Sequence, residues 1–284
     1  MKRILVLGGA TGLLGQALVE KIKEQGYLVQ SLGRKDGNLF EPSFLSQSLQ
    51  EIAPDLIFNT VAWTQVDAAE DHKSEAKSVN AGFPETLAKL LSPTHCHLVH
   101  FSTDFVFGEV ASKTLTEDTP PNPQCVYGST KLEGEQILLK LIPNQVTICR
   151  TAWLFGPHRK NFIETICKAA KKQGQLKVVA DQIGSPTYTR DLADWSLNLG
   201  LKQKVGIWHT VNSGQASWYE LAAWALKLAG IEAQVVAIKS EDWPQKAKRP
   251  SFSALDCQKL SSFLGTKPRA WQEAVELYIQ EVKF

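Results

Sequence analysis

Short apolar runs alternate with amphipathic segments of helical length through the first half of the chain. The run RILVLGG is followed by a segment in which Leu14, Leu18 and Ile22 recur every four residues and Gly26 ends the pattern. The same alternation continues as far as QVTICRTAWLFG (residues 145–156). Strands that are joined by helices lie parallel, in a sheet with helices on both faces. The sequence therefore predicts an α/β fold built on a doubly wound parallel sheet.

Capped helical patterns dominate the second half of the chain. The segment NFIETICKAAKKQG begins with a cap at Asn161 and carries a glutamate three residues later, and SWYELAAWALKLAG repeats this arrangement from Ser217. The strands between these helices are shorter and less regular. We therefore expect a sheet domain at residues 1–151. A smaller, mostly helical C-terminal substrate domain would occupy residues 152–284, with some segments returning to the first domain.

The charge balance limits the class of partner. The chain has 31 basic and 29 acidic residues without long runs of one sign, so we expect neither a nucleic acid nor an anionic membrane surface as its partner. No stretch approaches the roughly 18 to 20 apolar residues of a membrane span. The five cysteines lie far apart, which is typical of reduced thiols in a cytoplasmic protein. We expect a cytoplasmic protein that acts on a small molecule.

Three glycines separate the first predicted strand from the first predicted helix. Gly9, Gly12 and Gly15 lie in GGATGLLG, where glycines let the backbone approach a pyrophosphate and the helix N-terminus stabilises its charge. An ordinary tight turn is the alternative, but the strand before and the helix after match the dinucleotide-binding arrangement. The sequence therefore predicts a Rossmann-type domain.

The end of the second predicted strand bears on the choice of cofactor. An acidic residue there suits the ribose hydroxyls of NAD(H), whereas an arginine suits the 2′-phosphate of NADP(H). This chain has LGRKDGN, with Arg34 and Lys35 favouring the phosphate and Asp36 opposing it. We predict that NADP(H) is preferred and that NAD(H) is the alternative. If Arg34 and Lys35 bind no phosphate, they simply form a basic turn exposed to solvent.

A tyrosine and a lysine lie four residues apart at the start of a predicted helix, in VYGSTKLEGEQ. Tyr127 and Lys131 share one helical face because of this spacing. The free side chains have pKa values of about 10 and about 10.4, so neither is an acid or base at neutral pH. A nearby ammonium favours the phenolate and lowers the phenol's pKa, which would make Tyr127 a proton donor or acceptor for a substrate oxygen.

Two hydroxyls end the predicted strand that precedes this helix. Ser102 and Thr103 in HFSTDFVFG fall at the carboxyl edge of the sheet, where open parallel sheets place their ligands. A hydroxyl there can donate a hydrogen bond to a carbonyl that is about to be reduced. A tyrosine and a lysine four residues apart often occur by chance. The presence of these hydroxyls at the same edge supports a functional role for Tyr127 and Lys131.

Several motifs of the chain resemble those of a known family. The glycine triplet, NTVAWTQVD, STDFVFG and YGSTKLEGE are similar to motifs of the extended short-chain dehydrogenase/reductases, and within them to the dTDP-4-dehydrorhamnose reductase family. Further resemblance lies in RTAWLFGP, VADQIGSPTYTRDLA, GIWHTVNSGQASWYELA and RPSFSALD. The resemblance covers essentially the whole chain.

The resemblance implies roles for individual residues. Tyr127 would be the proton donor, Lys131 its tuner and ligand of the nicotinamide ribose, and Thr103 the hydroxyl partner of the substrate. Asp104 and Trp153 would contact the sugar nucleotide. The cofactor would lie along Gly9, Thr11, Gly12, Leu13, Leu14, Arg34, Asn38, Leu39, Ala62, Trp63, Thr64, Ser102, Tyr127 and Lys131.

Three positions depart from the family's pattern. Asn38 replaces the usual aspartate near the adenine, and Trp63 stands where a smaller aromatic residue or a histidine is common. FGE replaces FDG after the threonine motif, which alters a turn beside the substrate.

The implied reaction is reduction of the C4 ketone of a nucleotide-linked 6-deoxy-4-ketohexose, with dTDP-4-dehydro-L-rhamnose giving dTDP-L-rhamnose. Related 4,6-dehydratases carry an acid and a base directly after the threonine, whereas this chain has Asp104 and Phe105, and phenylalanine cannot take a proton. Epimerases use the same tyrosine, lysine and hydroxyl, and only the whole-chain resemblance disfavours them.

Two other functions stay open at this stage. Close relatives of these reductases act as non-catalytic NADP(H)-binding regulatory subunits of a methionine adenosyltransferase, and the intact Thr103, Tyr127 and Lys131 argue against that role. A reductase of a UDP-linked keto sugar is the other alternative. The sequence does not specify whether Mg²⁺ takes part or whether the protein is a monomer or a homodimer, and its histidines show no metal-binding spacing.

Several other side chains have structural interpretations. Among the eight tryptophans, Trp195, Trp218 and Trp224 lie in amphipathic helices and are expected to pack there rather than bind ligand. His100, inside a strand, is expected to be a core residue. Two arginines could bind diphosphate or form structural ion pairs, and both interpretations stay open for Arg190 and Arg249.

Overall fold

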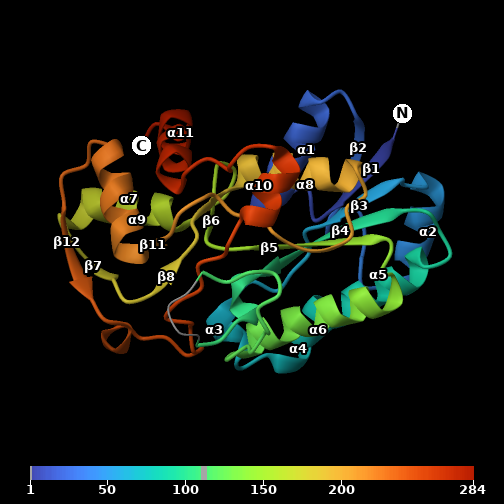
Figure 1. The fold of residues 1–284 in the computed structure, drawn as a ribbon, viewed down its shortest axis with the longest axis horizontal. Coiled ribbons are helices and arrows are strands. Elements are labelled where there is room, and N and C mark those ends of the chain that lie inside the picture. Colours follow the sequence, from blue (N-terminus) through green and yellow to red (C-terminus); the bar gives the residue numbers. More distant parts are fainter. Residues whose placement is uncertain (1, 110–113) are drawn as a thin grey trace.

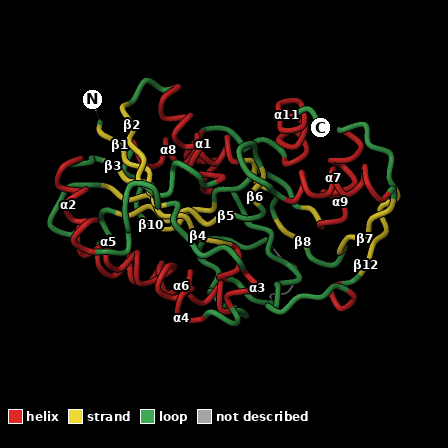
Figure 2. The backbone as a smooth tube through the Cα atoms, turned by 180° about the vertical axis from the view of Figure 1, so that it is seen from behind, coloured by secondary structure: helices red, strands yellow, loops and turns green. Residues whose placement is uncertain are grey.

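The computed structural model describes residues 2–109 and 114–284. Two lobes lie side by side, one built on a central sheet and one on short strands and helices near the C-terminus (Figure 1; Figure 2). The central sheet has six parallel strands, with helices on both faces, which confirms the predicted Rossmann-type α/β fold.

The order of the sheet is β10-β5-β4-β3-β1-β2. Its strands are β1 (Arg3–Leu7), β2 (Leu28–Leu32), β3 (Leu56–Asn59), β4 (His97–Thr103), β5 (Val146–Thr151) and β10 (Gly206–His209). The chain moves from β1 to β2 on one side and then crosses to β3 on the other. Ligands of open α/β sheets bind at the carboxyl ends of the strands beside such a reversal. The glycine loop follows β1 at this point.

Alternate residues of the strands pack against opposite helical layers. In β1, Ile4 and Val6 join a core that includes residues of the helices on one face: α1 (Leu13–Glu24), α8 (Thr189–Leu201) and α10 (Gln258–Leu264). Leu5 and Leu7 join a second core with the helices on the other face: α2 (Pro42–Ile52), α5 (Phe83–Leu91) and α6 (Val126–Leu141). Burial on both faces explains why these strands are continuous apolar runs.

A π-helical turn lies inside the helical segment 73–91. After α3 (Val66–Ala69), α4 (Lys73–Lys77) continues directly into η1 (Ser78–Gly82) and then into α5. Pro84 near the start of α5 has no backbone N–H to donate to the preceding turn, which favours the wider π-helical spacing there. Short π segments are frequent at functional sites.

The second lobe combines capped helices with short two-stranded sheets. Its helices are α7 (Phe162–Gln173), α9 (Trp218–Leu228) and α11 (Trp271–Val282). The predicted caps are confirmed: Asn161 accepts a hydrogen bond from the Glu164 backbone, and Ser217 and Glu220 form a capping box. The strand pairs are β6 (Leu154–Phe155) with β9 (Thr187–Tyr188), β7 (Gln175–Val179) with β12 (Gln234–Ile238), and β8 (Ile183–Gly184) with β11 (Ala216–Ser217). A short 3₁₀ turn, η3 (Ser240–Asp242), follows β12.

Three segments that follow β5 in the sequence lie in the first lobe. α8 packs against α1, α10 contributes to the same core, and β10 pairs with β5 at the edge of the central sheet. The edge strand of the sheet thus comes from residues more than fifty positions after β5.

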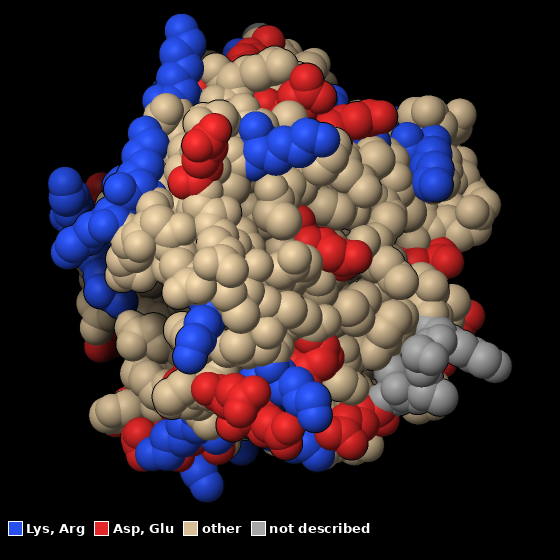
Figure 3. Space-filling view, turned by 90° about the vertical axis from the view of Figure 1, so that its left-hand side faces the viewer, with Lys and Arg blue, Asp and Glu red and all other residues tan. Residues whose placement is uncertain are grey.

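Charges of both signs occur on the face of the molecule at the second lobe. Basic side chains gather along one edge of this face, and acidic side chains lie beside a broad uncharged area (Figure 3). Among the helices formed by residues 2–109 and 114–284, none is long and apolar enough to cross a bilayer. All five cysteines carry free thiols, and Cys257 alone of them is not buried.

Candidate active site

The glycine loop brings the start of α1 close to the end of β1. Gly8 has a φ of +82°, and a Cβ at Gly15 would lie 2.7 Å from the carbonyl oxygen of Gly8. Side chains at these positions would block the turn. The loop therefore presents unobstructed backbone at the helix N-terminus, where Thr11 is exposed and Gly12 is the N-cap.

The first turn of α1 has the properties of an anion site. It contains no acidic residue, and its first backbone N–H groups have no partner within the helix. Leu14 is buried in the core, so only its backbone can face a ligand, whereas Leu13 is partly exposed. These features fit the pyrophosphate of a dinucleotide.

The loop after β2 exposes the predicted phosphate ligand. Arg34 is exposed, and among the described residues it forms no ion pair. The Asp36 carboxylate accepts a hydrogen bond from the Gly33 N–H at 2.8 Å, which folds it back onto the turn. Asn38 is exposed and caps its own turn, whereas the Leu39 side chain is buried in the core, so at most its backbone can contact an adenine.

The loop after β3 is held by a residue that the sequence did not single out. Asn80, in the π-helical turn η1, accepts a hydrogen bond from Trp63 N at 2.9 Å and donates to Thr130 of α6 at 3.1 Å. It thereby fixes the loop of Ala62, Trp63 and Thr64 against the helix that carries Tyr127. Asn80 is buried within this π-helical turn.

Thr103 and Asp104 form the turn that follows β4. The short 3₁₀ turn η2 (Asp104–Val106) is capped by Thr103, whose Oγ1 accepts from Phe105 N at 3.2 Å and donates to Asp104 Oδ1 at 3.0 Å. Ser253 Oγ donates to the other carboxylate oxygen of Asp104 at 2.6 Å. Burial raises the pKa of Asp104 to about 6, although the hydrogen bonds from Ser253 and Thr103 lower it.

Tyr127 lies in the first turn of α6, directly against η2. Its ring packs edge-on against Phe105 at 5.5 Å between ring centroids. This approach depends on Gly128, because a Cβ there would lie 2.1 Å from the Phe105 carbonyl oxygen. Helix α6 thus brings Tyr127 to the carboxyl edge of the sheet beside Thr103.

The acidity of Tyr127 differs from the prediction. We expected the Lys131 ammonium to lower the pKa of the phenol. Instead, burial raises the pKa of Tyr127 above its usual value, a hydrogen bond with Thr103 acts in the opposite direction, and the Asp104 carboxylate adds to the rise. The phenol is therefore fully protonated at neutral pH, in the state that a proton donor requires.

Lys131 is buried one turn further along α6. Its Nζ donates to the carbonyl oxygen of Phe101 at 2.6 Å and lies 3.3 Å from His100 Nε2. Burial lowers the pKa of Lys131 to about 8, and the Glu135 carboxylate acts against this shift. His100 is fully buried with polar partners on both ring nitrogens, as expected for a core residue.

Two buried hydroxyls lie at the carboxyl ends of β4 and β5. Within residues 2–109 and 114–284, neither Ser102 Oγ nor Thr151 Oγ1 has a hydrogen-bond partner. Thr151 pairs in register with Thr103, and sequence reasoning did not single it out. Buried polar groups normally find partners, so these two hydroxyls are available to a ligand at this edge.

Trp153 has an unusual backbone and a stacked neighbour. Its φ is +47°, which is rare for a bulky residue. Its ring stacks on Trp218 at 3.6 Å between centroids, with planes 6° apart. Trp218 packs in its helix as expected, and it also supports Trp153, the residue predicted to contact the substrate. The other two helical tryptophans behave as predicted: Trp195 is buried, and Trp224 packs against the core of the second lobe.

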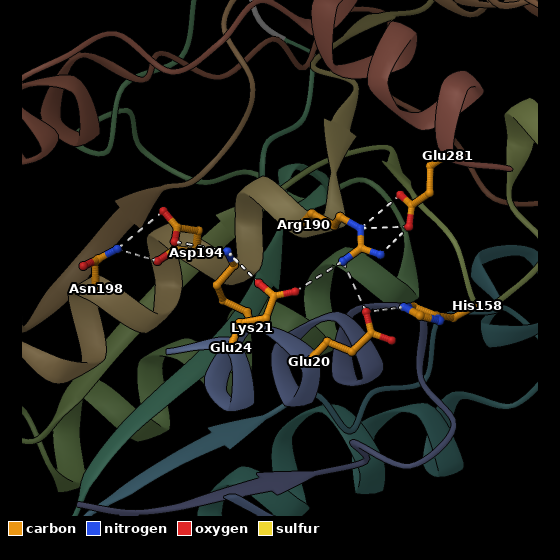
Figure 4. A network of polar contacts seen from close by, with 8 residues as sticks. All are labelled: Glu20, Lys21, Glu24, His158, Arg190, Asp194, Asn198 and Glu281. Atoms are coloured by element: carbon orange, nitrogen blue, oxygen red, sulfur yellow. Dashed lines mark hydrogen bonds and ion pairs between the residues drawn. The ribbon is translucent and has the colours of Figure 1, made fainter. Parts of the chain in front are cut away.

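The two candidate diphosphate arginines are engaged in ion pairs. Arg190 on α8 binds Glu281 of α11 and also approaches Glu20 and Glu24 of α1 (Figure 4). Arg249 binds Asp67 through both terminal nitrogens, at 2.7 and 3.0 Å, and holds the pKa of that carboxyl down to about 2. The structure favours the ion-pair interpretation for both.

Metal-ligating side chains do not gather in the described part of the chain. Among residues 2–109 and 114–284, no group of three or more His, Cys, Asp or Glu side chains is arranged to hold a metal ion.

Comparisons with known proteins agree with this geometry. A family model described as RmlD substrate binding domain matches residues 1–284. The chain is 36% identical to a dTDP-4-dehydrorhamnose reductase of Aggregatibacter actinomycetemcomitans, over 97% of this chain and 98% of that protein. It is also 36% identical to the spore coat polysaccharide biosynthesis protein SpsK of Bacillus subtilis, over 99% and 98% of the two chains.

A solved structure supports the same relationship. The dTDP-4-dehydrorhamnose reductase of Bacillus anthracis, in complex with NADP, superposes with a TM-score of 0.94 at 31% identity, covering 99% of both chains. Sequence identity and fold thus agree on the same family. The chain belongs to the RmlD substrate binding domain family, that of the dTDP-4-dehydrorhamnose reductases.

Proposed function

We propose that this protein is an NADPH-dependent reductase of a dTDP-linked 4-keto-6-deoxy sugar, with dTDP-4-dehydro-L-rhamnose as substrate and dTDP-L-rhamnose as product. The observation that carries the proposal is the meeting of Thr103, Tyr127 and Lys131 at the carboxyl edge of the sheet, beside a glycine loop that can take a pyrophosphate. The names of the relatives and the NADP complex of one of them support the substrate and the cofactor.

The cofactor site divides into three parts. The backbone at Gly12 and Leu13 would bind the pyrophosphate, and Arg34 the 2′-phosphate. Lys131 and the free hydroxyl of Ser102 would bind the nicotinamide half. NADPH, when bound, supplies the hydride that reduces the C4 ketone.

The protein's own chemistry in this reaction is positioning and proton transfer. Thr103 holds the substrate oxygen, and Tyr127 gives its phenolic proton to that oxygen as the alkoxide forms. The raised pKa of Tyr127 suits this direction of reaction, because the donor must be protonated beforehand and an alkoxide is a far stronger base than a phenolate. In the structure the Thr103 hydroxyl donates to Asp104, which also accepts from Ser253, so Thr103 would have to turn its one O–H group from Asp104 to the substrate oxygen.

The sugar nucleotide would lie at the carboxyl edge of the central sheet, next to the second lobe. Trp153 follows β5, two residues after Thr151, and its ring is held by Trp218. An aromatic face of this kind can stack on a base or pack against a sugar ring. We assign Trp153 to substrate binding on this basis. Asp104 is buried and accepts hydrogen bonds from Thr103 and Ser253, so it would act on the substrate indirectly, through Thr103.

Purified protein tests the proposal directly. NADPH oxidation, followed by absorbance, is measured with a panel of dTDP- and UDP-linked 4-keto sugars, and the product is identified by mass spectrometry and NMR. Ketone-dependent oxidation that is fastest with the dTDP-linked 4-keto-6-deoxy sugar supports the proposal. Tight NADPH binding without turnover on any ketone, together with copurification of a partner, would instead indicate a regulatory subunit.

A further inference from the structure

A buried row of polar side chains leads from β3 to Lys131. Asn59 Nδ2 lies 3.1 Å from His100 Nδ1, and His100 Nε2 lies 3.3 Å from Lys131 Nζ. The three side chains come from β3, β4 and α6, and their residues are between 0 and 2% exposed. Buried hydrogen bonds of this kind have to match donors with acceptors, because water cannot correct a mismatch.

The orientation of the Asn59 amide is fixed from one side. Its Oδ1 accepts a hydrogen bond from the backbone N–H of Val61 at 3.1 Å. A backbone N–H can only donate, so this atom must be the amide oxygen and the other must be the NH₂ group. Asn59 therefore donates to His100 Nδ1, which must be unprotonated.

This fixes the tautomer of His100. Burial lowers the pKa of His100 well below its ordinary value, and the neighbouring Lys131 lowers it further, so the ring is neutral. A neutral imidazole with an unprotonated Nδ1 carries its hydrogen on Nε2. The Nε2–H group therefore points at Lys131 Nζ.

A protonated Lys131 does not match this neighbour. An ammonium has only donors, so it cannot accept the Nε2–H of His100, whereas an uncharged amine can accept it through its lone pair. The amine keeps its bond to the Phe101 carbonyl oxygen, since it still has N–H groups to donate. Hydrogen bonding and burial thus act in the same direction on Lys131.

The surrounding charges act on both sides of this balance. Tyr127 and Glu135 of α6 lie one turn before and after Lys131, and the Glu135 carboxylate favours the ammonium. Its effect is moderated because Arg150 of β5 binds that carboxylate, with Nε 3.0 Å from Oε1.

Further charged groups belong to the elements packed around α6. Asp104 of η2 is next to Tyr127, Glu70 beside α3 accepts from Val126 N at the start of α6, and Lys77 of α4 pairs with Glu133 on the outer surface. Asp104, Glu70 and Lys77 therefore each have a partner other than Lys131. Among the described side chains, it is His100 that is directed at Lys131 Nζ.

We propose that Asn59 and His100 are positioning residues that bias Lys131 toward its uncharged amine in the cofactor-free protein. The assignment of Lys131 to the reaction site rests on the proposed function, but the hydrogen-bond arrangement does not. Lys131 would then gain or lose its proton close to neutral pH, so that ligands at this edge meet a lysine whose charge they can change.

The tautomer of His100 is the first test. Long-range ¹H–¹⁵N NMR spectra of the cofactor-free protein distinguish the two neutral tautomers and the imidazolium, and His100→Gln identifies the signal. We expect the Nε2–H tautomer without titration from about pH 5 to about pH 9, a range that spans the usual histidine pKa. A hydrogen on Nδ1, or protonation within this range, overturns the proposal. His97, whose Nε2 lies 2.7 Å from Thr147 Oγ1, is the control in the same strand.

The charge of Lys131 is the second test, read from the pH titration of its ¹³Cε signal. In Asn59→Asp, the new carboxylate can accept a hydrogen bond from Nδ1–H of His100. The other tautomer of His100 then becomes favoured, and its Nε2 presents a lone pair to Lys131. In His100→Gln, the side-chain oxygen of the glutamine can accept a hydrogen bond from Lys131. Both variants should raise the proton affinity of Lys131 at least about tenfold, whereas His97→Gln should leave it unchanged. Unchanged affinity in the folded variants overturns the proposal. Since neither test uses substrate, failure of the proposed function would not affect them.

Discussion

Gly184 lies directly against the indole of Trp153: a Cβ at position 184 would come 2.4 Å from Cε2 of that ring. Trp218 stacks on Trp153, so the Trp153 ring lies between the indole of Trp218 and the backbone of Gly184. The positive φ of Trp153 stores backbone strain that these contacts have to offset. Such strain is common where a side chain must be held in position for a ligand.

Gly184→Val should therefore displace Trp153 and weaken sugar-nucleotide binding. We expect KM for the dTDP-linked sugar to rise at least about tenfold, or about 1.4 kcal/mol, while the Kd for NADPH stays within a few fold. Steady-state kinetics and a fluorescence titration with NADPH measure the two quantities. Gly82→Ala is the control, because the nearest atom to its Cβ would be 4.0 Å away. An unchanged KM would remove Trp153 from the substrate site.

Tyr127→Phe removes the proposed proton donor and keeps the ring that packs on Phe105. Turnover should fall by at least roughly a hundredfold, the typical contribution of a general acid, with NADPH affinity nearly unchanged. Tyr219→Phe serves as the matched control on α9. Wild-type turnover in the Tyr127 variant would assign the proton transfer to another group.

Arg34→Ala should raise KM for NADPH about 10- to 100-fold, since a charge-assisted hydrogen bond contributes about 1.5–3 kcal/mol. KM for NADH should change little, because NADH has no 2′-phosphate. Kinetics with both cofactors give the preference directly, and Lys35→Ala tests whether the effect is specific to position 34. Equal losses with both cofactors would mean that Arg34 supports the loop and does not bind phosphate.

Asp104 should make folding stability fall as pH rises through weakly acidic values. Its folded-state pKa is raised from 3.8 to about 6, so between these values the folded protein binds the proton and the unfolded chain does not. The stability contribution is present below about pH 4 and is lost as pH rises through about 6, by up to roughly 3 kcal/mol. Urea unfolding of wild type and Asp104→Asn should differ by an amount that changes over this window. A constant difference would contradict the shift.

The Glu135 and Arg150 pair should behave as a buried ion pair. Both residues are at most 2% exposed, and two nitrogens of Arg150 bind the carboxylate. Glu135→Ala leaves a buried cation and should destabilise the protein by about 3–5 kcal/mol. The double variant Glu135→Leu, Arg150→Met should recover most of this loss, as measured by chemical denaturation. Equal destabilisation of both variants would mean that packing, not charge, dominates.

Much of the fold could be predicted because it depends on local patterns. Apolar runs, the spacing of Leu14, Leu18 and Ile22, and the caps at Asn161 and Ser217 each identify an element without its neighbours. The glycine loop and the spacing of Tyr127 and Lys131 are local in the same sense.

The rest depends on contacts between distant segments, which no local pattern records. Ser253 binds Asp104 across 149 positions, and Trp153 stacks on Trp218, which is 65 positions further along the chain. The acidity of Tyr127 was predicted in the wrong direction because its burial depends on how α6 packs on η2. The resemblance places Leu39 near the adenine, and the structure adds that its side chain is buried in the core, so that only its backbone could make this contact.

The position of β10 has a consequence during synthesis. Strand β5 is fully buried in the folded protein, paired with β4 on one side and with β10 on the other. Until Gly206–His209 has emerged from the ribosome, a nascent chain that has already assembled the first five strands carries an open, apolar edge. Unpaired edges of this kind recruit other chains. Chaperone capture should therefore matter most in the interval between emergence of residue 151 and emergence of residue 209 from the ribosome.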